Sequence, residues 1–371
     1  MKKKIVVAVI TDLVTDQRVH KVCTYLSEKG ADVTVIGRKL RSSSNVPERI
    51  YKTKRIFCFF SKGVAQYAEF NIKLLFHLLF TRGDIYLSND LDTLVPGYLT
   101  SRLKGKTLVY DSHEYFTGTP ELQHKPIKRR IWKSLENRIL PKLRYAYTVN
   151  ESIADLYRQE TGIEMKVVRN IPMRSHSPVG NAPKLPGNRK LLIMQGTGIN
   201  PDRGYEEAVL AMEHLSTDYL LVIIGSGTIW DKLQALVKGK KLEDRVMMIG
   251  KVEPEILRGY TRQAHLGLSF DKPDCLNYRF SLPNKIFDYI YAGLPILSSD
   301  LPEIKKILTR FDVGTCIREV TPTEIARCIQ LAFSDETRLN QMRENTRHAR
   351  EALTWENETE ILDQIFTPLL Q

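Results

Sequence analysis

Cysteine and long apolar runs are both scarce in this chain, and each scarcity argues against a class of protein. The five cysteines are scattered along 371 residues without a C-x-x-C pair, so neither a zinc site nor a disulfide framework is expected. The longest internal apolar stretch, residues 72–80, is interrupted by Lys73 and His77. It falls short of the ~20 residues needed to cross a bilayer.

The first residues resemble a signal peptide only superficially. Three lysines precede the apolar residues 5–10, but this run is shorter than the roughly 7–15 residues of a signal-peptide core. Thr11 and Asp12 then end it without a cleavage site of small residues. The run is better interpreted as a buried first strand. We therefore expect a cytoplasmic protein that is neither secreted nor integral to the membrane.

Acidic residues are outnumbered, with 43 Asp and Glu against 55 Lys and Arg, which gives a formal net charge of +12. A positive balance of this size predicts anionic partners: nucleotide phosphates, an anionic lipid surface or nucleic acid. The charge alone does not choose among them.

Short β-branched segments alternate with amphipathic helical segments along the chain. Strands are predicted at residues 5–10, 33–36, 85–87, 107–110 and 145–149, and again at 191–194, 219–224, 246–249, 266–270 and 295–298. Between the two sets, the proline- and glycine-rich residues 171–188 lack periodicity, as an interdomain linker does. This alternation predicts an α/β fold with two Rossmann-like domains facing across a cleft and ligands at the carboxyl ends of the strands.

Short motifs follow these strands in a fixed order over nearly the whole chain. The N-terminal half contains residues 16–19 (DQRV), 89–94 (NDLDTL), 110–114 (YDSHE), 149–152 (VNES) and 169–172 (RNIP). The C-terminal half contains residues 203–204 (RG), 225–227 (GSG), 283–288 (PNKIFD) and 292–295 (AGLP). Together these motifs resemble glycosyltransferase family 4, whose members have the GT-B fold.

The resemblance implies that one domain binds the acceptor and the other binds the nucleotide sugar. We predict an acceptor-side domain at residues 1–172, a linker at 173–188 and a nucleotide-sugar domain at 189–350. Apolar residues recur at helical spacing from Trp355 to Leu370, which predicts a helix. The resemblance implies that residues 351–371 cross back to the first domain as this helix.

The segment from Ser281 to Pro295 is the strongest part of the resemblance. It implies that Asp288 binds the ribose of the donor, since a carboxylate accepts hydrogen bonds from both vicinal hydroxyls. A helix that begins near Pro283 directs backbone N–H groups at the diphosphate, and Lys285 adds a cation in its first turn. Ser281, Leu282, Pro283 and Asn284 belong to the same donor cradle. An ordinary helix start with a solvated lysine is the alternative.

Two positions depart from the family pattern. Many members have a glutamate eight residues before the ribose-binding acid, where this chain has Phe280. Many also have an arginine five residues before Arg203, where this chain has Gly198. Lys285 is the candidate for the missing charge.

Arg203 is the main candidate for transition-state stabilisation. Transfer of a glycosyl group develops negative charge on the leaving diphosphate, and a guanidinium held there stabilises the transition state more than the ground state. Gly225, Ser226 and Val252 end or follow strands and are candidate base and phosphate contacts, with plain tight turns as the alternative. A complete G-x-G-x-x-G fingerprint is missing from the sequence, which argues against a dinucleotide oxidoreductase.

The first domain has its own strand-end candidates. His113 is expected to reach the transferred sugar, and Asp16, Arg18 and Asp90 to line the acceptor side. The alternative for Asp16 is capping of the helix that follows. Asp90-Leu91-Asp92 also resembles the metal-binding D-x-D motif of the GT-A fold, but the second Rossmann-like half argues against that fold. No metal or cofactor is expected beyond the nucleotide-diphosphate sugar that serves as donor.

Residues 125–144 form a predicted amphipathic helix rich in Lys and Arg. Such a helix could lie on an anionic membrane at the inner face, or it could simply cover the first sheet. Nucleic acid is not an expected partner, because the basic residues come without a recognised motif.

The resemblance implies a retaining, metal-independent hexosyltransferase that acts on a glycan or lipid-linked acceptor in surface polysaccharide biosynthesis. The alternatives are a non-catalytic nucleotide-sugar-binding module and a GT-B-fold sugar-nucleotide epimerase.

Overall fold

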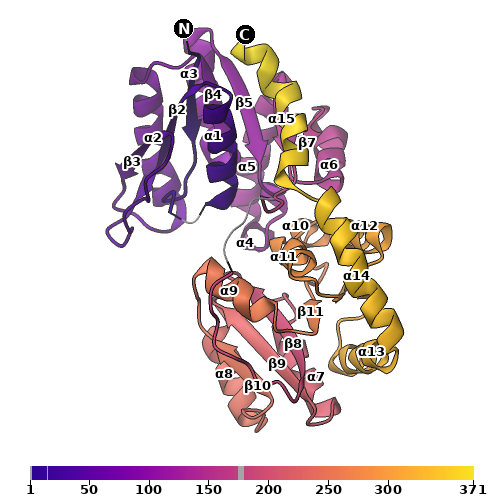
Figure 1. Ribbon diagram of the computed structural model, residues 1–371. Coiled ribbons are helices and arrows are strands. Elements are labelled where there is room, and N and C mark those ends of the chain that lie inside the picture. The colour runs from indigo at the N-terminus through magenta and orange to yellow at the C-terminus, as the bar shows by residue number, and fades with distance from the viewer. Residues whose placement is uncertain (1, 15, 174–178) are drawn as a thin grey trace. The chain divides into compact units, whose positions relative to one another are not determined.

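The computed structural model describes residues 2–14, 16–173 and 179–371. The chain folds into two compact units, one formed by residues 1–170 with 358–371 and the other by residues 171–357. Each unit is a parallel sheet with helices on both faces (Figure 1). The predicted α/β class with two Rossmann-like domains is therefore confirmed.

The sheet of the N-terminal unit has the strand order β3-β2-β1-β4-β5-β6-β7. Its strands are β1 (Lys4–Ala8), β2 (Asp32–Lys39), β3 (Lys52–Phe57), β4 (Ile85–Asn89), β5 (Thr107–Ser112), β6 (Tyr145–Thr148) and β7 (Lys166–Val167). Its helices are α1 (Gln17–Glu28), α2 (Gly63–Phe80), α3 (Leu91–Lys104), α4 (Pro120–Gln123), α5 (Pro126–Ile139) and α6 (Glu151–Thr161). Strand β1 lies in the middle, paired with β2 and β4, as its continuous apolar sequence predicts.

The sheet of the C-terminal unit has the strand order β10-β9-β8-β11-β12-β13. Its strands are β8 (Lys190–Gly196), β9 (Tyr219–Gly225), β10 (Val246–Ile249), β11 (Leu266–Ser269), β12 (Ile296–Ser299) and β13 (Gly314–Ile317). Its helices are α7 (Tyr205–Ala211), α8 (Trp230–Gly239), α9 (Pro254–Thr261), α10 (Leu276–Arg279), α11 (Asn284–Ala292), α12 (Pro302–Phe311), α13 (Pro322–Ser334) and α14 (Glu336–Ala352).

Two hydrophobic cores cover the two faces of this second sheet. Alternate residues of β8 enter opposite cores: Leu192 and Met194 enter one, and Leu191 and Ile193 enter the other. Strand β9 is buried along its whole length, which is why its sequence is apolar without alternation.

The predicted linker, residues 173–188, lies partly outside the described residues, because these exclude 174–178. Its later part packs on the C-terminal unit: the N–H of Gly180 donates to the carbonyl of Glu255, and the Gln263 side chain accepts from the N–H of Leu185. The predicted domain boundaries remain predictions.

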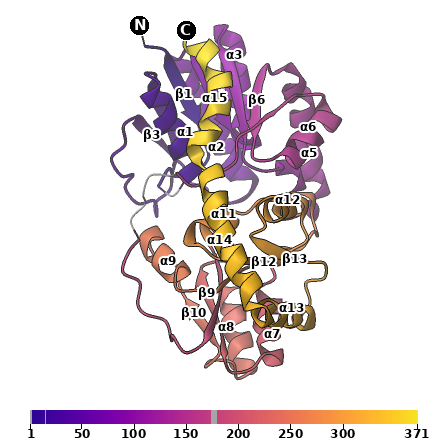
Figure 2. The same cartoon turned by 45° about the vertical axis from the view of Figure 1, so that its right-hand side comes forward.

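The helix predicted at residues 355–370 is confirmed as α15 (Trp355–Leu370). From Glu358 onward it belongs to the N-terminal unit, where it lies along α1 (Figure 2). The Tyr25 hydroxyl donates to Asp363 at 2.7 Å, and Lys29 pairs with the same carboxylate at 2.6 Å. None of the helices in the described residues has the length and apolar content needed to cross a bilayer.

Candidate active site

The candidate donor residues of the C-terminal unit lie at one edge of its sheet. Arg203 follows β8, Gly225 ends β9 and Val252 follows β10, so all three lie at the carboxyl ends of parallel strands. Helix α11 connects β11 to the parallel strand β12 and therefore begins at this same edge. This is the edge at which open α/β sheets bind ligands.

A buried carboxylate that the sequence analysis did not single out, Asp271, brings the two predicted cations together. Its side chain is fully buried and accepts from Arg203 Nη1 at 2.5 Å. Lys285 Nζ, from the first turn of α11, lies 3.9 Å from the other carboxylate oxygen. Two cations thus face one anion, so Asp271 neutralises only one of them.

Gly204 explains why the loop after β8 can approach Asp271 so closely. Its φ is +71°, and a Cβ atom there would lie 2.3 Å from the Cβ of Phe270, the residue before Asp271. The neighbouring N–H of Lys272 donates to the carbonyl of Asp202 at 2.8 Å. Only glycine allows this contact between the two loops.

The Arg203 side chain is held from a second direction by an aromatic ring. Its guanidinium carbon lies 3.9 Å from the centre of the Tyr278 ring, a cation–π contact. Burial alone would lower the pKa of Arg203, but Asp271 outweighs it and raises the pKa above its ordinary value. Within the described part of the chain, Arg203 Nε is buried without a hydrogen-bond partner. Arg203 is therefore a fixed cation with one donor still unused.

Helix α11 begins at Asn284, next to the predicted start near Pro283. Pro283 is its N-cap and contributes no side-chain acceptor to the first N–H groups. Just before it, the hydroxyl of Ser281 donates to the carbonyl of Tyr278, and Leu282 packs on the hydrophobic core. Asn284 is the first exposed residue of the helix. Within the described residues, Pro283 therefore gives this helix N-terminus no side-chain cap.

Asp288 lies one turn further along α11 and is held by a glutamine of β8. Gln195 donates from its side-chain nitrogen to Asp288 at 3.1 Å and accepts from the Thr261 hydroxyl at 2.7 Å. Gln195 is 2% exposed, whereas Asp288 is only partly buried. A carboxylate fixed in this way keeps acceptor capacity for a ligand.

The turn at the end of β9 packs backbone against backbone. A Cβ on Gly225 would lie 1.7 Å from the carbonyl oxygen of Gly196. The N–H of Ser226 donates to that same oxygen, and the N–H of Ile199 donates to the carbonyl of Ser226. The glycine is thus required by packing between two turns. Val252, after β10, is half-buried against the core.

Asp111 organises the strand ends of the N-terminal unit. Arg18 donates to it from Nε and from Nη2, the latter at 2.6 Å, and also donates from Nη1 to the carbonyl of Val168. Burial would raise the pKa of Asp111, but Arg18 and His113 outweigh it and lower the pKa to about 2. Arg18 is 4% exposed, so the structure places this predicted acceptor-side residue inside the unit.

His113 lies between two aspartates. Its Nδ1 is 3.4 Å from Asp90, its Nε2 is 3.3 Å from Asp111, and Nε2 also lies 3.1 Å from the side-chain oxygen of Asn89. Burial would lower the pKa of His113, but the two carboxylates outweigh it and raise the pKa to about 9. The imidazole is therefore a cation at neutral pH.

The backbone of Asp90 is strained and is held by His113. Its φ is +59°, a value that non-glycine residues rarely adopt. Its carboxylate accepts from the backbone N–H of His113 at 2.7 Å, and its own N–H donates to the carbonyl of Asp111. Asp16 accepts from the N–H of Val19 and so caps α1, which was the alternative foreseen for it.

Asp92, the second acid of the D-x-D sequence, points away from solvent. It is 5% exposed, and burial raises the pKa of its carboxyl well above the ordinary value. In the parts of the chain that the structure describes, no three His, Cys, Asp or Glu side chains are grouped as around a metal ion.

Comparisons with known proteins agree with this architecture. The family model described as Glycosyltransferase Family 4 matches residues 16–172, and the one described as Glycosyl transferases group 1 matches residues 181–349. A search of curated proteins finds no significant match.

Three solved structures illustrate the similarity of fold. Sucrose-phosphate synthase from Thermosynechococcus elongatus is 17% identical over 99% of each chain, with a TM-score of 0.78. Anabaena HepE in complex with UDP-glucose is 14% identical over 99% of this chain and 100% of that one, with a TM-score of 0.74. WaaG, a glycosyltransferase involved in lipopolysaccharide biosynthesis, is 13% identical over 97% of this chain and 99% of that one, with a TM-score of 0.69.

The fold is therefore that of the GT-B glycosyltransferases. The chain itself belongs to the family 4-like glycosyltransferases, with its C-terminal half in group 1.

Proposed function

We propose that this glycosyltransferase moves a hexose from a nucleotide-diphosphate sugar to a glycan or lipid-linked acceptor. In this proposal the reaction retains the anomeric configuration, needs no metal ion or cofactor, and serves surface polysaccharide biosynthesis. UDP is the first nucleotide to test, because HepE was solved with UDP and with UDP-glucose.

The observation that supports this proposal best is the pair of cations around Asp271. Arg203 and Lys285 face one carboxylate at the edge where α11 begins, so Asp271 neutralises only one of two cations that lie near the N-terminus of this helix. A leaving diphosphate gains negative charge in the transition state, and fixed cations stabilise it there without reorganisation. Asp288, oriented by Gln195, is the proposed ribose contact.

We propose a front-side displacement in which the leaving phosphate helps to deprotonate the acceptor. In this scheme Arg203 and Lys285 act on the diphosphate, while Gly225, Ser226 and Val252 contact the nucleotide. His113, as an imidazolium, is the proposed donor to a hydroxyl of the transferred sugar. Asp16, Arg18 and Asp90 support the acceptor side through the strand ends that they stabilise.

Contact with the inner face of the membrane is proposed for the basic residues 125–144, which include α5. Trp132 lies between the rings of Tyr67 and Phe116, whereas Ile127 and Ile131 are exposed among the cations. This pattern supports electrostatic attraction to anionic lipid, worth ~1 kcal/mol per near-surface cation.

Thermal unfolding with UDP, GDP, ADP and TDP tests the donor site. A nucleotide at about 100 times its Kd adds ~2.7 kcal/mol of stability, a shift of several degrees. We expect one nucleotide to stabilise the wild type but not Arg203→Ala/Asp288→Ala. The control variant Arg327→Ala/Glu324→Ala removes an exposed arginine–acid pair from the same unit and should keep the full shift. No shift with any nucleotide would remove the main support for the proposal.

Turnover separates transfer from the alternatives. A transferase releases nucleotide faster when an acceptor is added. A non-catalytic module binds the nucleotide but releases none from the sugar, and an epimerase converts the donor without an acceptor. Loss of activity in EDTA that manganese restores would contradict the metal-independent mechanism.

A further inference from the structure

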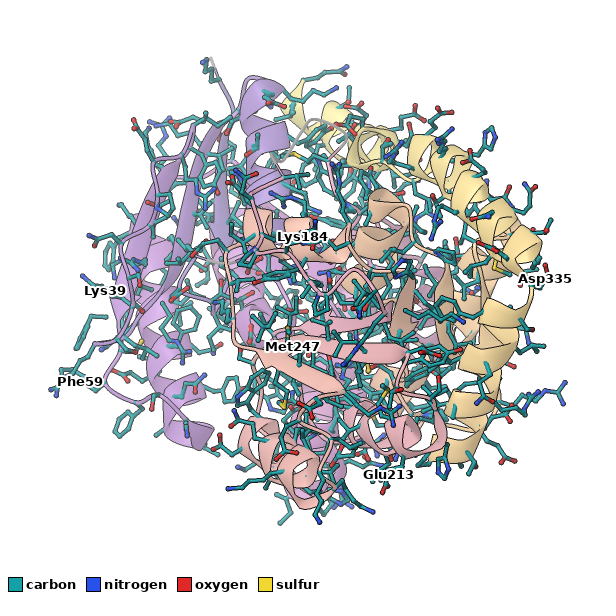
Figure 3. The ribbon with its side chains drawn as sticks, turned by 60° about the horizontal axis from the view of Figure 1, so that its bottom comes forward. Lys39, Phe59, Lys184, Glu213, Met247 and Asp335 are labelled. Atoms are coloured by element: carbon teal, nitrogen blue, oxygen red, sulfur yellow. The ribbon has the colours of Figure 1, made fainter. Side chains whose placement is uncertain are left out.

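Exposed aromatic and aliphatic side chains gather on one part of the N-terminal unit. Phe59 and Phe60 lie in the loop between β3 and α2, and Val64, Ile72, Phe76 and Phe80 lie on α2. Phe59 is 69% exposed and Phe80 is 87% exposed. Figure 3 shows Phe59 at the outer margin of this unit. These six residues are called the α2 face below. Exposed apolar side chains that gather in this way mark an interaction site.

Helix α2 is apolar on both of its sides. Phe70, Leu74 and Leu78 are buried against the unit. On the other side, Ile72, Phe76 and Phe80 recur every four residues, so they form one exposed row. A helix that covers a sheet normally presents polar residues to water, whereas one that is apolar all round is buried on every side or lies in a membrane.

The loop that presents the two phenylalanines is fixed by polar contacts. The carboxylate of Glu69 accepts from the N–H groups of Phe59 and Phe60, each at 3.0 Å. Lys73 donates to Glu69 at 2.6 Å and to the carbonyl of Phe57 at 2.9 Å. These contacts fix the backbone of the loop beside α2. The Phe59 ring lies 5.1 Å from Lys73 Nζ and edge-to-face on Phe57, and it is still 69% exposed.

The charge around the α2 face is positive. Residues 49–82 contain seven Lys and Arg but only one acid, Glu69. That acid is already occupied by the loop and by Lys73. Lys54 and Lys62 are exposed and form no ion pair within the described residues. An apolar surface with a cationic rim is complementary to anionic headgroups above an acyl layer.

We propose that the α2 face docks on an anionic lipid bilayer, with Phe59, Phe60 and the Ile72–Phe76–Phe80 row inserted at the boundary between headgroups and acyl chains. This contact adds apolar insertion to the electrostatic attraction proposed for residues 125–144, and it does not depend on the transfer reaction. A second copy of the chain is disfavoured as the occupant. A two-fold contact would bring the same cationic rims against each other.

Vesicle binding of the full chain tests the proposal. The wild type should co-sediment with vesicles of phosphatidylglycerol and phosphatidylcholine at low salt, and much less with phosphatidylcholine alone. Ile72→Ser/Phe76→Ser should weaken this binding by about tenfold or more, since each side chain loses its burial in the acyl layer. The control Leu331→Ser removes an exposed leucine from α13 of the other unit and should bind like the wild type.

Fluorescence quenching tests whether the α2 face inserts into the bilayer. In Phe76→Trp, lipids brominated on the acyl chains should quench fluorescence beyond the quenching seen in the wild type. Quenching equal to wild type would overturn the proposal, as would undiminished vesicle binding by Ile72→Ser/Phe76→Ser. A lipid-free dimer that this double variant converts to a monomer would instead identify a second copy as the occupant. The nucleotide-induced thermal shift should be unchanged in the double variant, so failure here is distinguishable from failure of the donor site.

Discussion

Asp271 shows how one buried carboxylate can define a cationic site. It pairs with Arg203 and lies within 3.9 Å of Lys285, and a buried carboxylate without such partners would strongly destabilise the fold. Its own charge cancels only one of the two cations. The remaining positive charge is available to a diphosphate at the start of α11, while the geometry of Arg203 is set by the protein.

We expect Asp271→Asn to separate binding from turnover. Loss of the carboxylate increases the local positive charge, so the Kd for UDP should change by less than about threefold. Arg203 loses its fixed position, and small displacements of a catalytic group cost up to ~10²-fold in rate. Nucleotide release from a UDP-sugar should therefore fall at least tenfold, with kcat carrying most of the loss.

The matched control is Asp300→Asn, which removes an acid paired with the exposed Lys305. It should leave the Kd for UDP and the rate of nucleotide release unchanged. If Asp271→Asn lost UDP binding and thermal stability together, Asp271 would be only a structural residue.

His113 connects the protonation of one side chain to the stability of the N-terminal unit. Burial opposes its charge, but Asp90 and Asp111 raise the pKa of His113 to about 9, from an ordinary value of 6.5. A pKa raised by folding stabilises the folded state fully below pH 6.5, and this stabilisation is lost as the pH rises toward 9. The free energy of unfolding should therefore fall by at most ~3 kcal/mol over this range.

In His113→Asn this fall between pH 6.5 and 9 should be absent, because asparagine does not titrate. Urea denaturation at a series of pH values measures it. His77→Asn, at an exposed histidine of α2, serves as the control and should keep the wild-type profile. Identical profiles for wild type and His113→Asn would mean that His113 does not carry the charge assigned to it.

At the scale of elements, local sequence pattern predicted most of the fold. Helix α15 has the predicted bounds, and α11 begins next to the predicted proline, since both carry periodic apolar residues and a start signal. Strand β3 was not predicted. Its residues 52–55 read Lys-Thr-Lys-Arg, and an edge strand can be this polar because only one side of it pairs.

The contacts between loops could not be predicted from the sequence pattern. Asp271 and Arg203 are 68 residues apart, and Asp111 and Arg18 are 93 apart, so no periodicity connects them. Each of the two acids does follow a predicted strand, and this position was the one feature of the sequence that could have indicated a site residue. Arg18 and Asp90 were recognised as strand-end residues, but only the structure shows that their partners are the Asp111 carboxylate and the His113 ring and backbone.

At the scale of the molecule, the chain leaves the N-terminal unit at residue 170 and returns to it at Glu358. The Glu358 carboxylate accepts hydrogen bonds from the backbone N–H and from the guanidinium of Arg169, at 2.7 Å each. Further along, Leu362, Ile365 and Phe366 are almost fully buried. The N-terminal unit therefore cannot complete its core until the last residues of the chain have been added.

Phe366→Ala tests this dependence. Phe366 is fully buried and packs edge-to-face on Tyr147 of β6, and removing such a ring costs roughly 3–5 kcal/mol. The loss should fall on the N-terminal unit, because that is the unit whose core the ring completes. Hydrogen exchange by mass spectrometry should show faster exchange in β1, β5 and β6, with β8 and β9 unchanged.

The converse variant, Leu297→Ala in the buried strand β12, should speed exchange in β8 and β11 and leave β1 unchanged, because Leu297 contributes to one of the two cores of the C-terminal unit. The two patterns together would show that the cores around Phe366 and Leu297 belong to different units. If Phe366→Ala accelerated exchange equally in both sheets, the C-terminal residues would stabilise the whole chain. Residues 358–371 would then not be a part of the N-terminal unit alone.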